Sequence, residues 1–199
     1  MSNPAYDIAS QISRNASQDR VYLVGIDGPG GSGKTILADN IRQKLEKGRF
    51  AVETVHNDDF YLPSASRSRL PANLKPIGGD FDWMRLHDQV LAPLRSGQIA
   101  RYVRYDWPSD RLAEEHEIQP RGIILIEGVY CTRAELRDLY DFRIWVDCPS
   151  EVRLSRGLYR DGESVRSIWV TQWKPAEDRY YDEHRPHVFA HVVVNGAAA

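Results

Sequence analysis

Gly28-Pro29-Gly30-Gly31-Ser32-Gly33-Lys34-Thr35 is the stretch that decides the fold, because it fits the phosphate-binding pattern G-x-x-x-x-G-K-[ST] at every fixed position. Glycines let successive backbone N–H groups turn toward phosphate oxygens, and the N-terminus of a following helix adds partial positive charge. Lys34 is expected to reach the β- and γ-phosphates of a nucleotide, and the Thr35 hydroxyl to bind Mg²⁺. The residues predicted to hold the nucleotide are Gly28, Gly30, Gly31, Ser32, Gly33, Lys34 and Thr35.

The pattern requires a strand before the loop and a helix after it, and the sequence predicts both. Residues 21–26 form a short apolar, β-branched-rich segment that predicts a buried strand. After the loop, Ala38, Ile41 and Leu45 recur at helical spacing, and Gly48 is placed to end that helix. The alternative is a glycine-rich turn that matches by chance, and the strand and helix on either side disfavour it.

Length and composition predict one α/β domain over residues 1–199 and exclude several classes of partner. The net charge is −2 with acidic and basic residues interspersed, which indicates neither a nucleic-acid-binding surface nor a polybasic membrane patch. Residues 1–20 are polar with no apolar core, and no later segment is long enough to span a bilayer, so we expect a cytoplasmic protein. Cys131 and Cys148 lack metal-type spacing and are expected to be inert thiols. The sequence leaves open whether the chain forms a homo-oligomer.

Five parallel strands interleaved with helices are predicted, which makes an open α/β sheet with its ligand crevice beyond the carboxyl ends of the strands. A helix is expected after Asp82, its N-cap, and another from Ser150, also a cap, to about Arg160. The loop glycines, Asp58, Glu127 and Asp147 fall at strand ends. The predicted strands are 21–26, 51–55, 122–128, 142–147 and 191–194.

Two segments do not fit this alternation of strands and helices. Residues 62–79 are rich in Pro, Ser, Arg and Gly and indicate a long irregular loop. Residues 101–107 alternate as an exposed strand does, and they could pair with residues 115–119 in a small hairpin. We therefore take residues 80–120 as a substrate-side insertion.

Three carboxylates are candidates for chemistry. Glu127 ends an apolar strand, so it could bind Mg²⁺ directly or through water, or it could cap the following turn. Transfer of a phosphoryl group to a hydroxyl needs a carboxylate that orients the nucleophile and takes its proton. Asp58 or Asp59 could fill that role, and only one of two neighbours is expected to face the site. The alternative for the pair is a turn or a helix cap.

Arginines on the helix after residue 150 suggest a lid over residues 153–170. Arg153, Arg156 and Arg160 could neutralise a transferring phosphoryl group or could form a solvated face. Arg160-Asp161-Gly162 also offers a hinge. Three histidines, His184, His187 and His191, lack a partner that would complete a zinc shell, and the aromatic pairs Trp169/Trp173 and Tyr180/Tyr181 are expected in packing.

Together these residues resemble the uridine kinase and phosphoribulokinase group of P-loop kinases, from about Val21 to Asn195. No Asn-Lys-x-Asp guanine-reading motif is present, which disfavours a GTPase. The elements that carry the resemblance are the phosphate loop, Asp58-Asp59-Phe60-Tyr61, Phe81-Asp82, Tyr105-Asp106-Trp107, Ile126-Glu127-Gly128, Arg153-Leu154-Ser155-Arg156 and Arg160-Asp161.

The resemblance implies a P-loop NTPase fold with a small β-hairpin insertion and a lid, and it implies roles for individual residues. Asp58 would be the catalytic base, beside Lys34 and Arg160 as further catalytic residues. Asp82 would bind the ribose hydroxyls, and Tyr105 the base or sugar. The substrate-binding residues expected in this way are Asp58, Tyr61, Asp82, Tyr105, Asp110 and Arg160, and the metal ligands are Thr35 and Glu127.

The chain departs from this family in two places. Asp110 stands where pyrimidine-reading members carry a histidine, and an ionised carboxylate cannot donate a hydrogen bond. If Asp110 faces the crevice, it favours a ligand that offers N–H or O–H groups; on a mobile hairpin it would be solvated. The lid segment after Asp161 is shorter than usual.

These observations predict an ATP- and Mg²⁺-dependent kinase that transfers the γ-phosphoryl group to a hydroxyl of a small molecule, most simply the 5′-hydroxyl of a nucleoside. Two alternatives stay open. One is a kinase for another sugar-like or polyol acceptor, and the other is a nucleotide-binding regulatory module with little turnover. Asp58 discriminates against the second, because a binder needs no base there.

Overall fold

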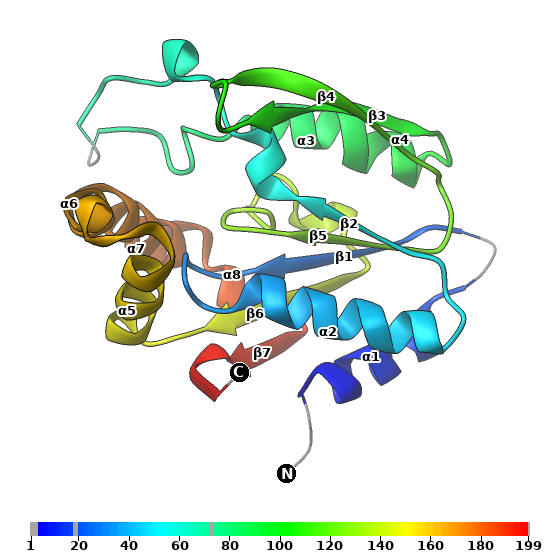
Figure 1. The fold of residues 1–199 in the computed structure, drawn as a ribbon. Helices are drawn as coiled ribbons and strands as arrows, with labels where there is room; N and C mark the ends of the chain where they lie inside the picture. Colours follow the sequence, from blue (N-terminus) through cyan, green and yellow to red (C-terminus); the bar gives the residue numbers. More distant parts are fainter. Residues whose placement is uncertain (1–3, 18–19, 72–73, 199) are drawn as a thin grey trace.

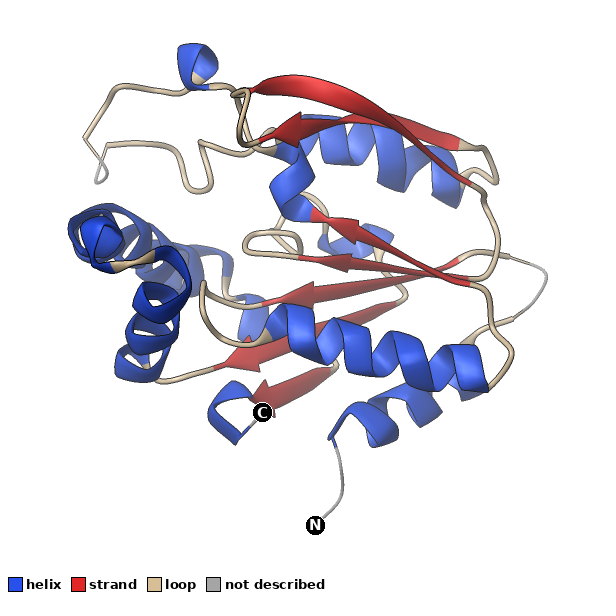
Figure 2. Cartoon of the chain, in the orientation of Figure 1, coloured by secondary structure: helices blue, strands red, loops and turns tan. Residues whose placement is uncertain are grey.

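A five-stranded parallel sheet carries the phosphate loop at its centre, in a computed structural model that describes residues 4–17, 20–71 and 74–198. Its strand order is β2-β5-β1-β6-β7 (Figure 1; Figure 2). The predicted α/β fold is confirmed, and each strand lies within about one residue of its predicted bounds. The strands are β1 Tyr22–Asp27, β2 Val52–His56, β5 Ile123–Glu127, β6 Phe142–Asp147 and β7 Val192–Asn195.

The sheet is covered on both faces because its central strands are apolar on both faces. In β1, Val24 and Ile26 pack on one side and Leu23 on the other. Helices α1 (Pro4–Asn15) and α2 (Lys34–Lys47) cover the first face. A helix that runs through α3 (Trp83–Leu86), a π-helical segment (His87–Leu91) and α4 (Ala92–Arg95) covers the second (Figure 1).

A hairpin lies above this second face, formed by β3 (Ala100–Asp106) and β4 (Arg111–Ile118). Its predicted pairing is confirmed, with Arg101 opposite Glu117, although β4 begins four residues earlier than expected. Tyr102 on β3 packs against Phe60, which follows β2, at a ring-centroid distance of 5.1 Å. The hairpin is therefore fixed to the end of β2.

The helices after β6 include residues 153–170, where the sequence predicts a lid, and we refer to them below as the lid helices or lid. They are α5 (Ser150–Asp161), α6 (Arg166–Ile168), a π-helical segment (Trp169–Trp173), α7 (Lys174–His184) and α8 (Pro186–Phe189). In Figure 1, α5, α6 and α7 gather beyond the carboxyl ends of β1 and β6. Gly157 on α5 lets Trp169 lie against the helix, because a Cβ there would be 2.2 Å from the indole.

The helix ends follow local signals, with one exception. Gly33 begins α2 in the left-handed region at φ 94°, which favours glycine, and Gly48 ends that helix as predicted. Asp82 caps α3 as predicted, its side chain accepting a hydrogen bond from the Arg85 N–H at 3.1 Å. The expected cap at Ser150 is wrong: Ser150 is the first helical residue, and the preceding Pro149 makes no side-chain cap.

Helix α1 was not predicted, because the polar composition of residues 1–20 hides its apolar stripe. Ile8 and Ile12 are 2% and 0% exposed and belong to the core under α2. Within residues 4–17, 20–71 and 74–198, none of the helices has the length and apolar character needed to cross a membrane.

Candidate active site

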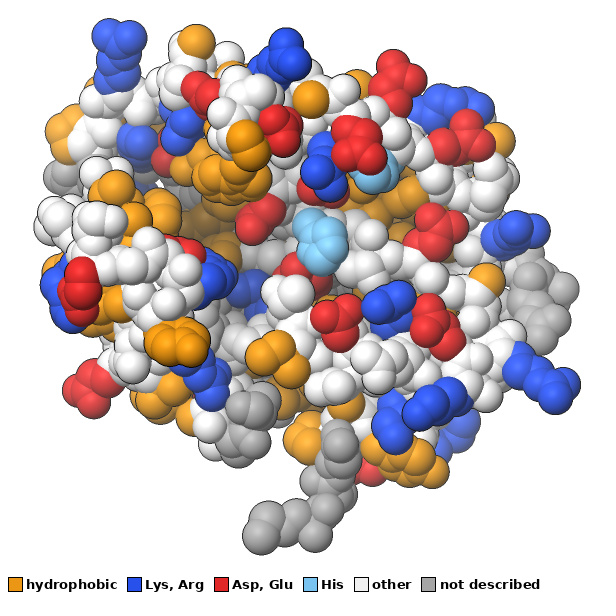
Figure 3. Space-filling view, in the orientation of Figure 1, with side chains coloured by type: hydrophobic (Ala, Val, Ile, Leu, Met, Phe, Trp, Pro, Cys, Tyr) orange, Lys and Arg blue, Asp and Glu red, His pale blue; other side chains and the backbone are white. Residues whose placement is uncertain are grey.

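A cavity of about 750 Å³ lies at the carboxyl ends of β1, β2 and β5. Its walls are the phosphate loop, the turn after β2, residues 75–81, the turn after β5, the hairpin tip and the lid. Figure 3 shows the surface hollowed between the lid and the hairpin, with hydrophobic side chains in the hollow. The sheet therefore places the site where open α/β folds bind ligands.

The phosphate loop forms the floor of this cavity. Gly30, Gly31, Gly33, Lys34 and Thr35 line it, as the sequence predicts. Lys34 is only 7% exposed, and its Nζ donates to the Pro29 carbonyl at 2.9 Å. Two predicted phosphate-contacting residues, Gly28 and Ser32, lie behind the lining. The buried Ser32 hydroxyl has no hydrogen-bond partner among the described residues.

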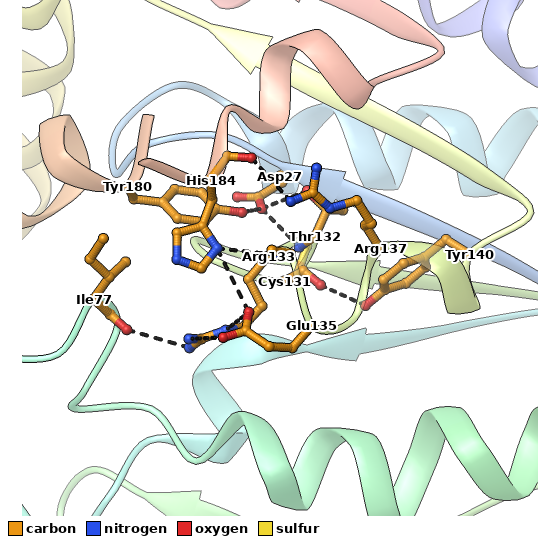
Figure 4. Close-up of polar contacts among 11 residues, drawn as sticks. Asp27, Ile77, Cys131, Thr132, Arg133, Glu135, Arg137, Tyr140, Tyr180 and His184 are labelled. Atoms are coloured by element: carbon orange, nitrogen blue, oxygen red, sulfur yellow. Dashed lines mark hydrogen bonds and ion pairs between the residues drawn. The ribbon is translucent and has the colours of Figure 1, made fainter. Parts of the chain in front are cut away.

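Asp27, the residue before the loop, anchors it (Figure 4). Its carboxylate is fully buried and accepts hydrogen bonds from Gly28 N at 2.7 Å and from Tyr130 N at 3.0 Å. The Thr132 hydroxyl donates at 2.8 Å and the Tyr180 hydroxyl at 2.6 Å. Burial raises the pKa of Asp27, and these donors oppose that rise. The start of the loop is thus fixed to the turn after β5 and to α7.

Glu127 and Thr35 form an oxygen-rich corner beside the loop. The Thr35 hydroxyl lies 3.3 Å from Glu127 Oε1, and His56 Nδ1 lies 2.7 Å from the same oxygen. The hydrogen bond to Glu127 raises the pKa of His56. Hydroxyl and carboxylate oxygens are ligands that suit Mg²⁺, so the residues present fit the metal predicted here.

Asp58 and Asp59 lie in the turn after β2 and point to different places. Asp58 lines the cavity. Limited solvation raises the pKa of its carboxyl and the Glu127 charge adds to this rise, while Lys34 and Arg160 oppose it. Asp59 instead accepts a hydrogen bond from the Tyr102 hydroxyl at 3.1 Å. Of the two carboxylates, Asp58 is therefore the one that faces the cavity.

Aromatic rings from outside the lid form one wall of the cavity, which we call the aromatic wall. Tyr61 stacks on Trp107 with ring centroids 4.7 Å apart, and Phe81 meets Tyr61 edge-on at 4.9 Å. Tyr130 from the turn after β5 continues this wall. Flat apolar faces of this kind suit a ring-shaped ligand.

A charged pair interrupts the aromatic wall. Lys75 Nζ lies 3.1 Å from one oxygen of Asp80 and 3.2 Å from the other, and both residues line the cavity. The backbone carbonyl of Lys75 accepts a hydrogen bond from Arg179 of α7 at 3.0 Å. The Ile77 carbonyl lies 3.4 Å from the buried Arg133 (Figure 4). Two arginines thus brace the segment that carries the pair.

Three residues expected to touch substrate do not line the cavity. Asp82 is the N-cap of α3, so its carboxylate is directed at the helix. Tyr105 is 4% exposed and donates its hydroxyl to Asp110 at 2.6 Å. Asp110 neither faces the crevice nor is free in solvent, because Ser64 and Tyr105 both donate to it. The polar groups of these three side chains already make hydrogen bonds within the protein.

The arginines of α5 have separate roles. Arg156 and Arg160 line the cavity, and Arg160 also pairs with Asp161 at 2.7 Å. Arg153 does not line it: Arg153 is buried and pairs with Glu177 at 2.7 Å. Glu177 also accepts from Gly30 N at 2.8 Å, so it joins the phosphate loop to the lid.

The histidines and cysteines that the sequence singled out do not line the cavity. His184 and His191 accept hydrogen bonds from the backbone N–H groups of Ala134 and Arg143, both at 3.0 Å. His187 stacks on Tyr181 at 3.9 Å. Cys131 and Cys148 are buried and free, and burial raises the pKa of both thiols. Asp147 ends β6 outside the cavity lining.

Sequence reasoning missed Lys75, Asp80, Tyr130 and Glu177 as cavity residues. It also expected Trp169 and Trp173 only in packing, whereas both line the cavity. Lys75 and Asp80 lie in a segment with no periodic pattern, and Glu177 reaches the loop from 147 residues away. Only Tyr130 had a usable signal, since it follows the strand end at Glu127 by three residues.

Comparison with known proteins agrees with this geometry. The sequence profile of the Phosphoribulokinase / Uridine kinase family matches residues 23–180. The uridine kinase of Staphylococcus carnosus is 33% identical over 157 residues, covering 73% of each chain. The uridine-cytidine kinase B of Dictyostelium discoideum is 32% identical over 178 residues, covering 83% of this chain and 72% of that protein.

Solved structures share the fold. A possible uridine kinase from Bacillus stearothermophilus superposes with a TM-score of 0.76 at 24% identity, covering 96% of this chain and 97% of that one. D-glycerate 3-kinase from Cryptococcus neoformans superposes with a TM-score of 0.63 at 19% identity, covering 92% and 90%. The chain belongs to the phosphoribulokinase and uridine kinase family.

Proposed function

We propose that this protein is an ATP- and Mg²⁺-dependent kinase that phosphorylates the 5′-hydroxyl of a nucleoside. The observation that carries the proposal is the position of Asp58, a carboxylate on the wall of the same cavity that the phosphate loop and the aromatic residues line. A protein that only bound nucleotide would have no need of a base at that point. Family membership and the uridine kinase relatives support the same reaction.

Each group has a task in this reaction. Asp58 orients the acceptor hydroxyl and takes its proton as the oxygen attacks the γ-phosphorus. The phosphate-loop N–H groups and Lys34 hold the phosphates and stabilise the charge that moves to the leaving β-phosphate oxygen. Arg160 enters from the lid against the transferring group. Mg²⁺, held by Thr35 and Glu127, would neutralise phosphate charge when bound.

The acceptor would lie against the aromatic wall. Tyr61, Phe81, Trp107 and Tyr130 can contact the faces of a base and a ribose, while Asp58 stays within the same cavity. The lid would exclude water, which otherwise competes with the acceptor for the phosphoryl group.

A second candidate, phosphorylation of another sugar-like or polyol acceptor, is favoured by one observation. Lys75 and Asp80 present an ammonium and a carboxylate side by side in the cavity. Such a pair can donate to and accept from neighbouring hydroxyls of any polyol. The nucleoside is preferred because the aromatic wall is larger than an open-chain polyol needs.

A screen for acceptor-stimulated ADP release tests the proposal. Purified protein with ATP and Mg²⁺ is assayed against ribonucleosides, deoxyribonucleosides, free sugars and polyols. We expect a nucleoside to give the largest stimulation, and chelation of Mg²⁺ to remove it. Stimulation by sugars or polyols alone selects the second candidate, and no stimulation by any acceptor selects a regulatory nucleotide binder.

A further inference from the structure

Asp110 gathers hydrogen bonds from two separate segments of the chain. It lies in the turn between β3 and β4 in the left-handed backbone region, at φ 50°. Its Oδ1 accepts from Ser64 N at 2.9 Å and from the Tyr105 hydroxyl at 2.6 Å, and Arg67 Nη2 lies 3.3 Å away. The Ser64 hydroxyl donates to the other oxygen.

The two segments that Asp110 joins carry Tyr61 and Trp107, the rings that stack in the wall of the cavity. Ser64 lies three residues after Tyr61, and Tyr105 lies two residues before Trp107. Arg67 also lies over the Tyr61 ring, with its guanidinium carbon 5.0 Å from the ring centroid. Because Trp107 is 54% exposed, neighbouring packing alone fixes its ring poorly.

We propose that Asp110 is a positioning residue, which fastens the hairpin turn to residues 64–67 and thereby holds Trp107 over Tyr61 as the acceptor-binding face. The proposal rests on the proposed function, in which the acceptor occupies this side of the cavity. Hydrogen bonds to a carboxylate are about twice as strong as bonds between neutral groups, so one side chain can fix an exposed turn. The rest of the hairpin is held independently, by the β3–β4 ladder and by the contact of Tyr102 with Phe60.

This role changes how the acceptor is recognised. The Tyr105 hydroxyl and the Ser64 N–H both donate to Asp110, and neither Tyr105 nor Asp110 lines the cavity, so the polar edge of an acceptor ring finds no partner in either. The face of Trp107 remains available in the cavity. Asp110 therefore affects acceptor binding through ring position and not through contact.

Asp110→Asn tests the proposal, with Asp106→Asn as the matched control. Asp106 lies in the same hairpin, but its carboxylate accepts only from Ser109 among the described contacts, at 3.0 Å from the Ser109 N–H. We expect Asp110→Asn to speed amide hydrogen exchange in peptides covering residues 62–71 and 104–112. We also expect the acceptor KM to rise about tenfold, with kcat and the KM for MgATP within about twofold of wild type.

A general loss of folding would behave differently. It would lower the melting temperature, speed exchange throughout the chain and reduce kcat without a selective change in acceptor KM. The proposal is overturned if Asp110→Asn matches Asp106→Asn in hydrogen exchange, or if its acceptor KM stays within twofold of wild type. Should no acceptor stimulate the wild type, the proposed function fails, and the exchange comparison by itself still decides whether Asp110 fastens the turn.

Discussion

Two adjacent carboxylates, Asp58 and Asp59, have different partners because one turn directs them to different places. Asp58 faces the cavity, and Asp59 accepts from the Tyr102 hydroxyl. We predict that Asp58→Asn lowers kcat about 10²-fold or more, the usual scale for loss of a general base, with little change in ATP affinity. Steady-state kinetics and ATP titration measure both effects. Asp59→Asn is the control and should do less; if it proves the more damaging change, Asp58 is not the base.

The pH dependence of the reaction reports on the same residue. A base must be deprotonated, so activity rises with pH through its pKa, and limited solvation raises the pKa of Asp58 above 3.8. We predict that the acid limb of kcat/KM for the acceptor, measured at saturating MgATP, lies above that value. An acid limb at or below 3.8 would show that solvation in the cavity does not perturb Asp58.

At the scale of elements, Asp82 matches both a family motif and the pattern of a helix N-cap. The motif predicts a side chain that binds substrate, and the cap predicts one that bonds to the helix. Phe81-Asp82 resembles a substrate-binding element, whereas Asp82 also precedes an apolar helical stripe and caps α3. The capping rule is local and predicted the contact correctly. Resemblance cannot show where a carboxylate points, because that depends on how residues 60–62 pair with residues 80–82.

We predict that Asp82→Ala lowers the free energy of unfolding by about 1 kcal/mol, the usual cost of a lost N-cap. Chemical denaturation measures this loss. Asp82→Ser supplies another capping oxygen and should keep both the stability and the acceptor KM of the wild type. A serine variant that folds as stably as wild type but has a greatly raised acceptor KM would instead show that the carboxylate binds substrate.

At the scale of the whole molecule, the sequence predicts the site residues at the ends of strands. It predicts few of the site residues that other segments bring to the cavity. Glu127 ends β5 and Asp58 follows β2, so the sheet brings them to the phosphate loop. Glu177 contacts Gly30 only because α7 packs over the loop, and Lys75 lies in the cavity because Arg179 and Arg133 hold its segment. Such contacts depend on tertiary packing, for which a single sequence has no local pattern.

Transfer of labelled phosphate from [γ-³²P]ATP to a nucleoside tests the central claim most directly. Wild-type protein, Lys34→Ala and Lys47→Ala are compared; both lysines belong to α2, but Lys47 is exposed at its far end. We predict labelled nucleoside monophosphate with wild type and with Lys47→Ala, and none with Lys34→Ala although its thermal melt shows a folded protein, because Lys34 supplies charge at the transferring group. Activity of Lys34→Ala within a few-fold of wild type would contradict the assignment of the phosphate loop, and label that appears only as inorganic phosphate with every acceptor would contradict the assignment of a kinase.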